Sequence, residues 1–166
     1  HIVHHQSEDY NLSTALRQAW FQPAFSWVFY LPLAFVGFDP DAFIAVKGVN
    51  LVYQFWIHTE IIKKMPGIFE LILNTPSHHR VHHGTDSIYV DKNYAGIFII
   101  WDKLFNTFQP EMHTPKYGIL HNIKSYNPLY IATHEWIDML RDLKWKNGIV
   151  KNFNYIFKPP EWKHKN

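Results

Sequence analysis

A chain of 166 residues is long enough for one domain, and its lack of cysteine excludes disulfide bonds and thiolate metal sites. Its formal net charge of +2, with no basic stripe carrying spaced aromatic residues, argues against nucleic-acid binding. Aromatic residues make up 17% of the chain, a share typical of proteins that meet a bilayer interface.

The chain opens with three histidines, His1, His4 and His5, in the spacing H-x-x-H-H. If this stretch is helical, the three side chains stand at i, i+3 and i+4 and share one face. Three neutral imidazoles on one face suit a metal that accepts nitrogen ligands, namely iron, copper or zinc. Because the sequence starts inside this motif and without a Met, we expect it to be the later part of a longer protein.

Two long apolar stretches follow the first histidines. Residues 20–38 carry no charge, residues 39–41 (Asp-Pro-Asp) form a turn signal, and residues 42–57 carry only Lys47. At about 1.5 Å per residue, each stretch is roughly long enough to cross a hydrocarbon core of about 30 Å. The pattern predicts a membrane helical hairpin at about residues 20–57. The alternative is a pair of buried helices in a soluble all-α domain.

The charges around this hairpin predict its orientation. Arg17 precedes the first arm and Lys63 and Lys64 follow the second, whereas the tip carries Asp39 and Asp41. The positive-inside rule then places both open ends on the cytosolic side. Histidines before and after the hairpin can therefore meet on one side of the membrane.

The H-x-x-H-H spacing recurs at His79, His82 and His83, about 78 residues after its first occurrence. A histidine-rich surface helix or an expression tag would explain one copy, but a tag would not recur inside the chain. Between the copies, His58 ends an apolar stretch, where it is either an ordinary interfacial residue or a further ligand. The candidate metal ligands are His1, His4, His5, His58, His79, His82 and His83. Histidines outside the spacing, which are expected to tolerate replacement, include His78, His113 and His164.

The remaining sequence contains helical patterns and no strand-rich region. Residues 95–105 form an apolar run that fits either an amphipathic helix on a surface or ordinary core packing. A second helical pattern begins at Asn127 and continues to Lys144. The predicted fold is therefore all-α: a membrane hairpin with a cytosolic helical cap that carries the histidine boxes. We expect one domain over residues 1–144 and a C-terminal tail over 145–166, extended from Lys158 onward.

Four stretches carry a resemblance to the fatty acid hydroxylase and sterol desaturase superfamily of membrane di-iron enzymes. They are residues 4–18, 53–60, 74–84 and 91–105, and the histidine boxes flanking a hairpin lie among them. The chain is most similar to the ether-lipid-cleaving branch. The likeness covers residues 1–108 well and continues more weakly through 117–119 and 127–128.

The resemblance implies a multi-pass enzyme of the endoplasmic reticulum membrane with its histidine boxes on the cytosolic side. Its cofactors would be iron, as a di-iron centre, and tetrahydrobiopterin. Its lipid substrate would be an alkylglycerol, whose ether-bearing carbon is hydroxylated with oxygen so that the hemiacetal collapses to a fatty aldehyde and glycerol. The family's ligands map onto the two histidine triads, and His58 matches an isolated family histidine. The family also has an upstream histidine box that this sequence lacks, so we expect its seven histidines to fall short of filling two iron sites.

Two other readings remain open. One is another sterol or fatty acyl hydroxylase or desaturase of the same superfamily. The other is a zinc-dependent membrane hydrolase, or a metal-holding scaffold without catalysis. The residue types favour a redox metal, because acid–base side chains cannot break an unactivated C–H bond.

Carboxylates near the histidines are candidates for orienting the imidazoles through their second ring nitrogen. Taken singly, each is more often a surface or capping residue. Asn93 and Tyr94 follow the second triad closely and are expected to line the pocket. The candidate carboxylates are Glu8, Asp9, Glu60, Asp91 and Asp102.

Overall fold

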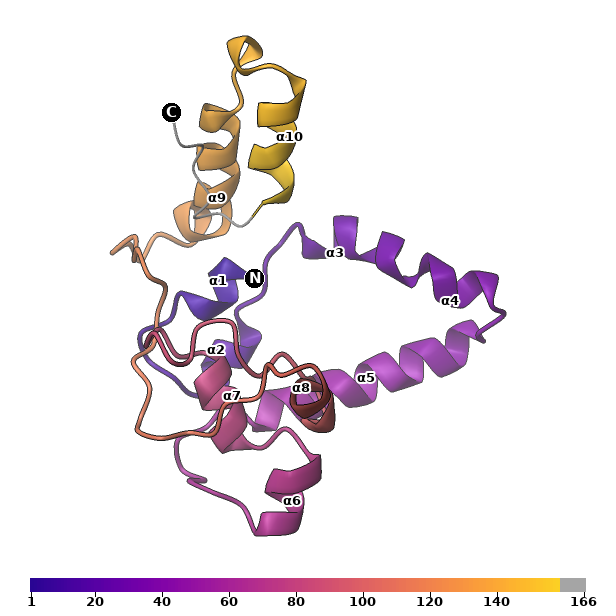
Figure 1. Cartoon of the computed structure of the whole chain (residues 1–166). Helices are drawn as coiled ribbons and strands as arrows, with labels where there is room; N and C mark the ends of the chain where they lie inside the picture. The colour runs from indigo at the N-terminus through magenta and orange to yellow at the C-terminus, as the bar shows by residue number, and fades with distance from the viewer. Residues whose placement is uncertain (159–166) are drawn as a thin grey trace. The chain divides into compact units, whose positions relative to one another are not determined.

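The computed structural model describes residues 1–158, apart from the side chain of Trp145. Its regular elements within these residues are all helical, which confirms the predicted all-α class (Figure 1). The expected extended tail beyond Lys158, including His164, lies outside the described residues. In chain order the helices are α1 (Ile2–His5), α2 (Leu12–Leu16), α3 (Gln22–Ser26), η1 (Trp27–Tyr30), α4 (Leu31–Phe35), α5 (Pro40–Trp56), α6 (Gly67–Ile72), α7 (Pro76–His82), α8 (Ile100–Leu104), α9 (Pro128–Asp142), η2 (Trp145–Asn147) and α10 (Ile149–Phe157).

The chain divides into two compact units, His1–Asn122 and Ile123–Asn166. This division falls before α9, whereas the sequence pattern placed α9 with the domain that precedes it. The first unit contains both histidine triads and His58, so it holds the whole candidate metal centre.

The apolar stretches at 20–57 extend from the rest of the first unit as two arms that meet at their far end (Figure 1). The rings of Tyr30 and Phe43 lie 4.8 Å apart between centroids, and the Lys47 ammonium lies 5.4 Å from the Tyr30 ring. Gly37, with φ +81°, makes the turn between the arms, and Asp39 caps α5 by accepting the N–H of Ala42 at 2.9 Å. Local turn chemistry thus places the reversal where the Asp-Pro-Asp signal predicts it.

The first arm is not the continuous helix that its composition suggests. Pro23 and Pro32 each lie in the first turn of a new helix, α3 and α4, because proline lacks an N–H and fits there best. The second arm, α5, is continuous over 17 residues and rises about 25 Å. Among the described residues, no helix has both the length and the apolar composition needed to cross a bilayer. A membrane-spanning hairpin therefore stays a prediction.

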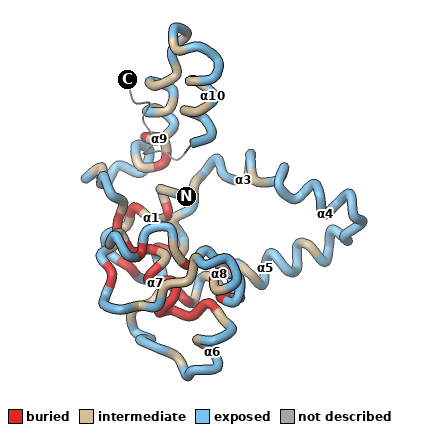
Figure 2. Tube along the Cα trace, in the orientation of Figure 1, coloured by how far each residue is buried: buried red, intermediate tan, exposed pale blue. Residues whose placement is uncertain are grey.

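The buried part of the first unit centres on α7 (Figure 2). Six of its seven residues are buried, and most of them are polar. The apolar contribution is small: Val81 of α7 itself and, around the helix, Tyr10, Ile57, Tyr89 and Ile99. An interior so rich in polar groups depends on hydrogen bonds, since unpaired buried polar groups are costly.

Arg80 ties α7 to the segment that follows His58. Its guanidinium donates to both carboxylate oxygens of Glu111 at 2.7 and 2.6 Å. It also donates to the carbonyls of Thr59, Ile62 and Lys63 at 2.9, 2.7 and 2.5 Å. One buried side chain thereby fixes the backbone next to His58 relative to the helix that carries the second triad.

Asn93 fixes α7 from the other side. Its amide donates to the carbonyls of His78 at 3.0 Å and Gln109 at 2.8 Å, and its oxygen accepts the Gln109 N–H at 2.9 Å. The buried carboxylate of Asp102 accepts the backbone N–H groups of residues 94 and 95, both at 2.8 Å. Of the apolar run at 95–105, only α8 is helical, and its buried Asp102 ties this helix to the backbone of residues 94 and 95.

The second unit is a pair of helices, α9 and α10. The helical pattern from Asn127 is confirmed as α9, with the Asn127 side chain accepting the N–H groups of Leu129 at 3.0 Å and Tyr130 at 3.3 Å. Within residues 145–166, expected as a tail, the structure forms η2 and α10.

Candidate metal centre

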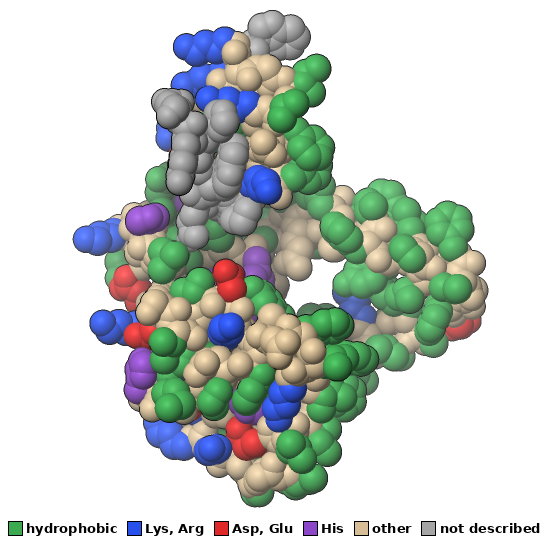
Figure 3. All heavy atoms as spheres, viewed as in Figure 1, with side chains coloured by type: hydrophobic (Ala, Val, Ile, Leu, Met, Phe, Trp, Pro, Cys, Tyr) green, Lys and Arg blue, Asp and Glu red, His purple; other side chains and the backbone are tan. Residues whose placement is uncertain are grey.

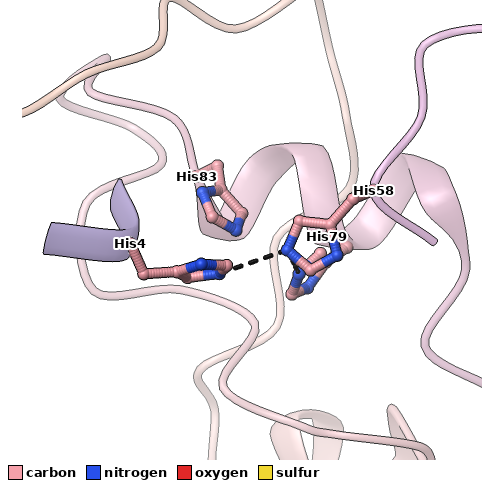
Figure 4. Close-up of side chains that lie close together, drawn as sticks. All are labelled: His4, His58, His79 and His83. Carbon is pink, nitrogen blue, oxygen red and sulfur yellow. Dashed lines mark hydrogen bonds between the residues drawn. The ribbon is translucent and has the colours of Figure 1, made fainter. Parts of the chain in front are cut away.

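The six histidines of the two H-x-x-H-H copies and His58 all come together in the first unit, although they lie up to 82 positions apart in the sequence. They form two groups, and within each group one ring nitrogen per residue lies within 4.8 Å of the others. Each triad contributes to both groups. The buried group is His4, His58, His79 and His83 (Figure 4), and the more exposed group is His1, His5 and His82.

In the buried group, the Nε2 atoms of three histidines converge. The Nε2 of His58 lies 3.1 Å from that of His4 and 3.0 Å from that of His79. Helix α1 supplies His4, the segment directly after α5 supplies His58 and helix α7 supplies His79, so the group joins both sides of the hairpin. His83, the C-cap of α7, adds the fourth ring.

Backbone carbonyls decide which nitrogen of these rings carries the proton. The Nδ1 of His4 donates to the Arg17 carbonyl at 3.1 Å, and the Nδ1 of His58 donates to the Gln54 carbonyl at 2.6 Å. A carbonyl only accepts and a neutral imidazole has one N–H, so both Nε2 atoms present lone pairs. Two lone pairs facing each other at 3.1 Å repel unless a positive centre lies between them.

Burial keeps these rings neutral. Desolvation, followed by the charge of neighbouring histidines, lowers the pKa of His4 to about 4 and that of His5 to about 2. The same two causes hold the pKa values of His79 and His83 well below the usual range. Since a proton is disfavoured here, a metal ion is the positive centre that the geometry accommodates.

A buried nitrogen atom of the fourth ring completes this fit. The Nε2 of His83 has no hydrogen-bond partner. Buried polar atoms are rarely left without one, and such exceptions often mark the place of an ion. The residues of the buried group therefore fit a metal ion bound entirely by imidazole nitrogen.

The second group lies directly against the first. The Nε2 atoms of His1 and His5 are 2.9 Å apart, and the Nδ1 of His82 donates to the Lys92 carbonyl at 3.3 Å. The ring of His5 stacks on that of His83 with centroids 4.1 Å apart. Adjoining donor sets of four and three imidazoles match a centre for two metal ions better than two unrelated sites.

The groups that orient the imidazoles differ from those expected. At His4, His58 and His82 this role falls to backbone carbonyls, which no sequence motif reveals. Among the expected carboxylates, Glu60 accepts from the Tyr117 hydroxyl at 3.0 Å, and Asp102 caps backbone N–H groups.

Two tyrosines that the sequence analysis missed form a wall beside the histidines. The ring of Tyr10 lies 5.7 Å from that of His58, 5.2 Å from that of His83 and 4.7 Å from that of Tyr117, centroid to centroid. Tyr10 follows the first triad closely, which was a usable signal, whereas nothing in the spacing connects Tyr117 to the site. Of the expected lining residues, Tyr94 has its ring centroid 6.1 Å from that of His82. Asn93 instead donates to the His78 carbonyl of α7.

His78 lies outside both groups, as its spacing predicts, but it is buried rather than free at the surface. Its Nε2 lies 2.9 Å from a carboxylate oxygen of Glu70, and its Nδ1 lies 3.2 Å from the Leu73 carbonyl oxygen. The same carboxylate accepts from Thr75 and Ser77, both at 2.8 Å. His78 therefore belongs to the structural network at the start of α7.

The helical fold and the clustered histidine boxes define the class of this protein as a helical histidine-box protein. Comparison with known proteins agrees with this class. The family model described as fatty acid hydroxylase matches residues 1–107, and the chain belongs to this family. This confirms the family predicted from the histidine boxes. No solved structure matches the chain.

Three similar proteins carry the same name, alkylglycerol monooxygenase. The chain is 50% identical to alkylglycerol monooxygenase of Homo sapiens, over 98% of the chain and 36% of that protein. It is 49% identical to alkylglycerol monooxygenase of Danio rerio, over 98% of the chain and 36% of the relative. It is 41% identical to that of Caenorhabditis elegans, over 98% of the chain and 34% of the relative. The chain thus spans about a third of the length of the curated relatives it matches.

Proposed function

We propose that this chain is the metal-binding part of a membrane monooxygenase that cleaves the ether bond of alkylglycerols with oxygen and tetrahydrobiopterin. One oxygen atom enters the ether-bearing carbon, and the other leaves as water with two electrons from the pterin. The resulting hemiacetal collapses to a fatty aldehyde and glycerol. The observation that carries the proposal is the pair of adjoining histidine groups, and the relatives' shared name supports the substrate.

Iron held by the two groups would supply the redox chemistry that an unactivated C–H bond demands. The chain's own residues hold and orient that metal. Carbonyl partners of His4 and His58 fix the ring tautomers, so that Nε2 faces the centre. Tyr10, which is buried, lies against the rings of His58 and His83 and excludes water from that side of the buried group.

The arms at residues 20–56 support a membrane location and a lipid substrate. Nearly all of their side chains are exposed, and Phe29 and Phe35 are 80% and 88% exposed. Figure 3 shows hydrophobic side chains covering this part of the molecule. A large exposed apolar surface marks an interaction site, and a bilayer is the partner that fits its length and its tyrosines and tryptophans. We place the protein in the endoplasmic reticulum membrane, with the histidines on the cytosolic side.

The competing candidate is a zinc hydrolase, because an all-nitrogen ligand set also suits zinc. The deciding experiment measures aldehyde release by the full-length protein with alkylglycerol, oxygen and tetrahydrobiopterin, together with its metal content. Bound iron with pterin-dependent aldehyde release supports the proposal. Bound zinc without oxygen consumption favours the hydrolase, and oxidation of a sterol or fatty acyl chain without pterin favours another branch of the family.

A further inference from the structure

Helix α10 packs with its apolar face outward. Its five large apolar residues follow a helical spacing and are 49–89% exposed. Its polar residues Lys151, Asn152 and Asn154 are half-buried instead. Ordinary amphipathic helices of globular domains have the reverse arrangement. The apolar face consists of Ile149, Val150, Phe153, Ile156 and Phe157.

This orientation is held by specific hydrogen bonds. The Asn152 side chain donates to the Lys144 carbonyl at 3.1 Å and accepts the Lys144 N–H at 3.4 Å. It also accepts from the Asn147 amide at 3.3 Å, and that amide donates to the Asp142 carbonyl at 2.9 Å. Because Asn152 fixes the rotation of α10 about its own axis, the apolar face cannot turn inward without losing these bonds.

The charge around the apolar face indicates what covers it. Residues 123–158 carry six Lys and Arg residues against three Asp and Glu residues. Lys144 and Lys146 precede α10 and Lys158 follows it, and all three are exposed. The rings of Phe153 and Phe157 lie 4.4 Å apart on the outer face between these lysines. Aromatic rings on one face with cations at both ends are the pattern of a helix that lies in a membrane interface.

We propose that α10 lies on an anionic lipid surface, with its apolar face among the acyl chains and its flanking lysines on the headgroups. Figure 3 shows the hydrophobic side chains gathered along α10 in the second unit. This surface lies outside the residues that the family model matches. It is therefore a membrane contact in addition to the hairpin at 20–57.

These 166 residues contain no cysteine, which allows a local test with single introduced cysteines. Phe153→Cys, carrying an environment-sensitive fluorophore, is compared with Asp138→Cys at an exposed polar position of α9. Both proteins are reconstituted into phosphatidylcholine vesicles containing phosphatidylserine and a nitroxide-labelled lipid. We expect a blue-shifted emission and strong nitroxide quenching at position 153, and neither at position 138. The readout needs no turnover, so it stands apart from the proposed reaction.

Three results would overturn the proposal. An unshifted emission at position 153 would mean that the face stays in water. A blue shift without nitroxide quenching would mean that a second copy or another protein segment covers it. Equal quenching at both positions would mean unspecific association. The role of the lysines is tested by introducing Lys144→Glu and Lys158→Glu together into the Phe153→Cys chain. We expect the nitroxide quenching at position 153 in the phosphatidylserine-containing vesicles to be lost. Unchanged quenching would show that these lysines take no part in the contact.

Discussion

At the scale of single residues, the facing Nε2 atoms of His4 and His58 constrain the chemistry most. Both rings are neutral and both donate through Nδ1 to carbonyls, so their lone pairs meet at 3.1 Å. A metal ion turns this repulsion into binding. The Nε2 of His79, 3.0 Å from that of His58, and the unpartnered Nε2 of His83 extend the same argument to four ligands.

Replacing His83 with Ala should therefore remove a ligand rather than a packing group. We expect iron affinity to fall by more than the roughly 10- to 100-fold that loss of a group supporting a ligand costs, and turnover to fall with it. Iron content by mass spectrometry and aldehyde release measure the two effects. His121→Ala, at an exposed position outside both groups, is the matched control and should retain both. Normal iron content in His83→Ala would remove this residue from the site.

Replacing His78 with Ala should destabilise the fold, contrary to the tolerance expected from its spacing. The change removes the imidazole from the half-buried Glu70 carboxylate, which keeps its hydrogen bonds from Thr75 and Ser77, and a lost hydrogen bond to a charged group costs about 1.5–3 kcal/mol. Thermal unfolding should show a lower midpoint, while iron content measured below that midpoint stays close to normal. His113→Ala, at a half-exposed ring, should unfold like the unchanged chain. Equal midpoints for both variants would mean that the His78 network contributes nothing.

At the scale of elements, the end of α7 depends on a close approach at Gly84. A Cβ at this position would lie 2.9 Å from a ring carbon of Tyr89 and 3.1 Å from the Cβ of Pro115. Since Tyr89 is buried and donates to the His113 carbonyl at 2.9 Å, it has little room to move. Gly84 thus allows the loop to close directly beneath His83.

Gly84→Ala should accordingly displace the C-cap of α7 and with it His83. We expect a loss of about 1–3 kcal/mol in the free energy of unfolding, typical of overpacking, together with weaker iron binding. Denaturant unfolding and iron content are the measurements. Gly48→Ala is the control, because a Cβ there meets nothing within 4 Å and alanine favours the interior of α5. Comparable stability of the two variants would show that the contact with Tyr89 relaxes freely.

At the scale of the whole molecule, the candidate metal centre joins segments that have few other reasons to stay together. His4 and His79 come from helices α1 and α7 and His58 from the segment after α5, and the apolar core around them is small. A ligand that binds only the folded state stabilises it in proportion to the logarithm of its concentration. Metal binding should therefore contribute a large share of the stability of the first unit.

Removing the metal with a chelator should lower the unfolding midpoint of the first unit, and adding iron back should restore it. At about 100 times the dissociation constant, the bound metal contributes about 2.7 kcal/mol. Scanning calorimetry of chelated and iron-loaded protein measures the difference. A chain with stoichiometric iron and an unchanged midpoint would show that the histidine groups are already held in place by packing alone.

Sequence by itself determined the all-α class, the seven candidate histidines and the family, because helical spacing and motif identity are local properties. Tertiary structure decided how the two triads divide into groups of four and three, since that division depends on how α1 and α7 rotate against His58. It also decided that backbone carbonyls orient the rings and that Tyr117 reaches the wall of the site. These contacts join positions far apart in the chain or involve only the backbone, and neither leaves a periodic signal among the side chains.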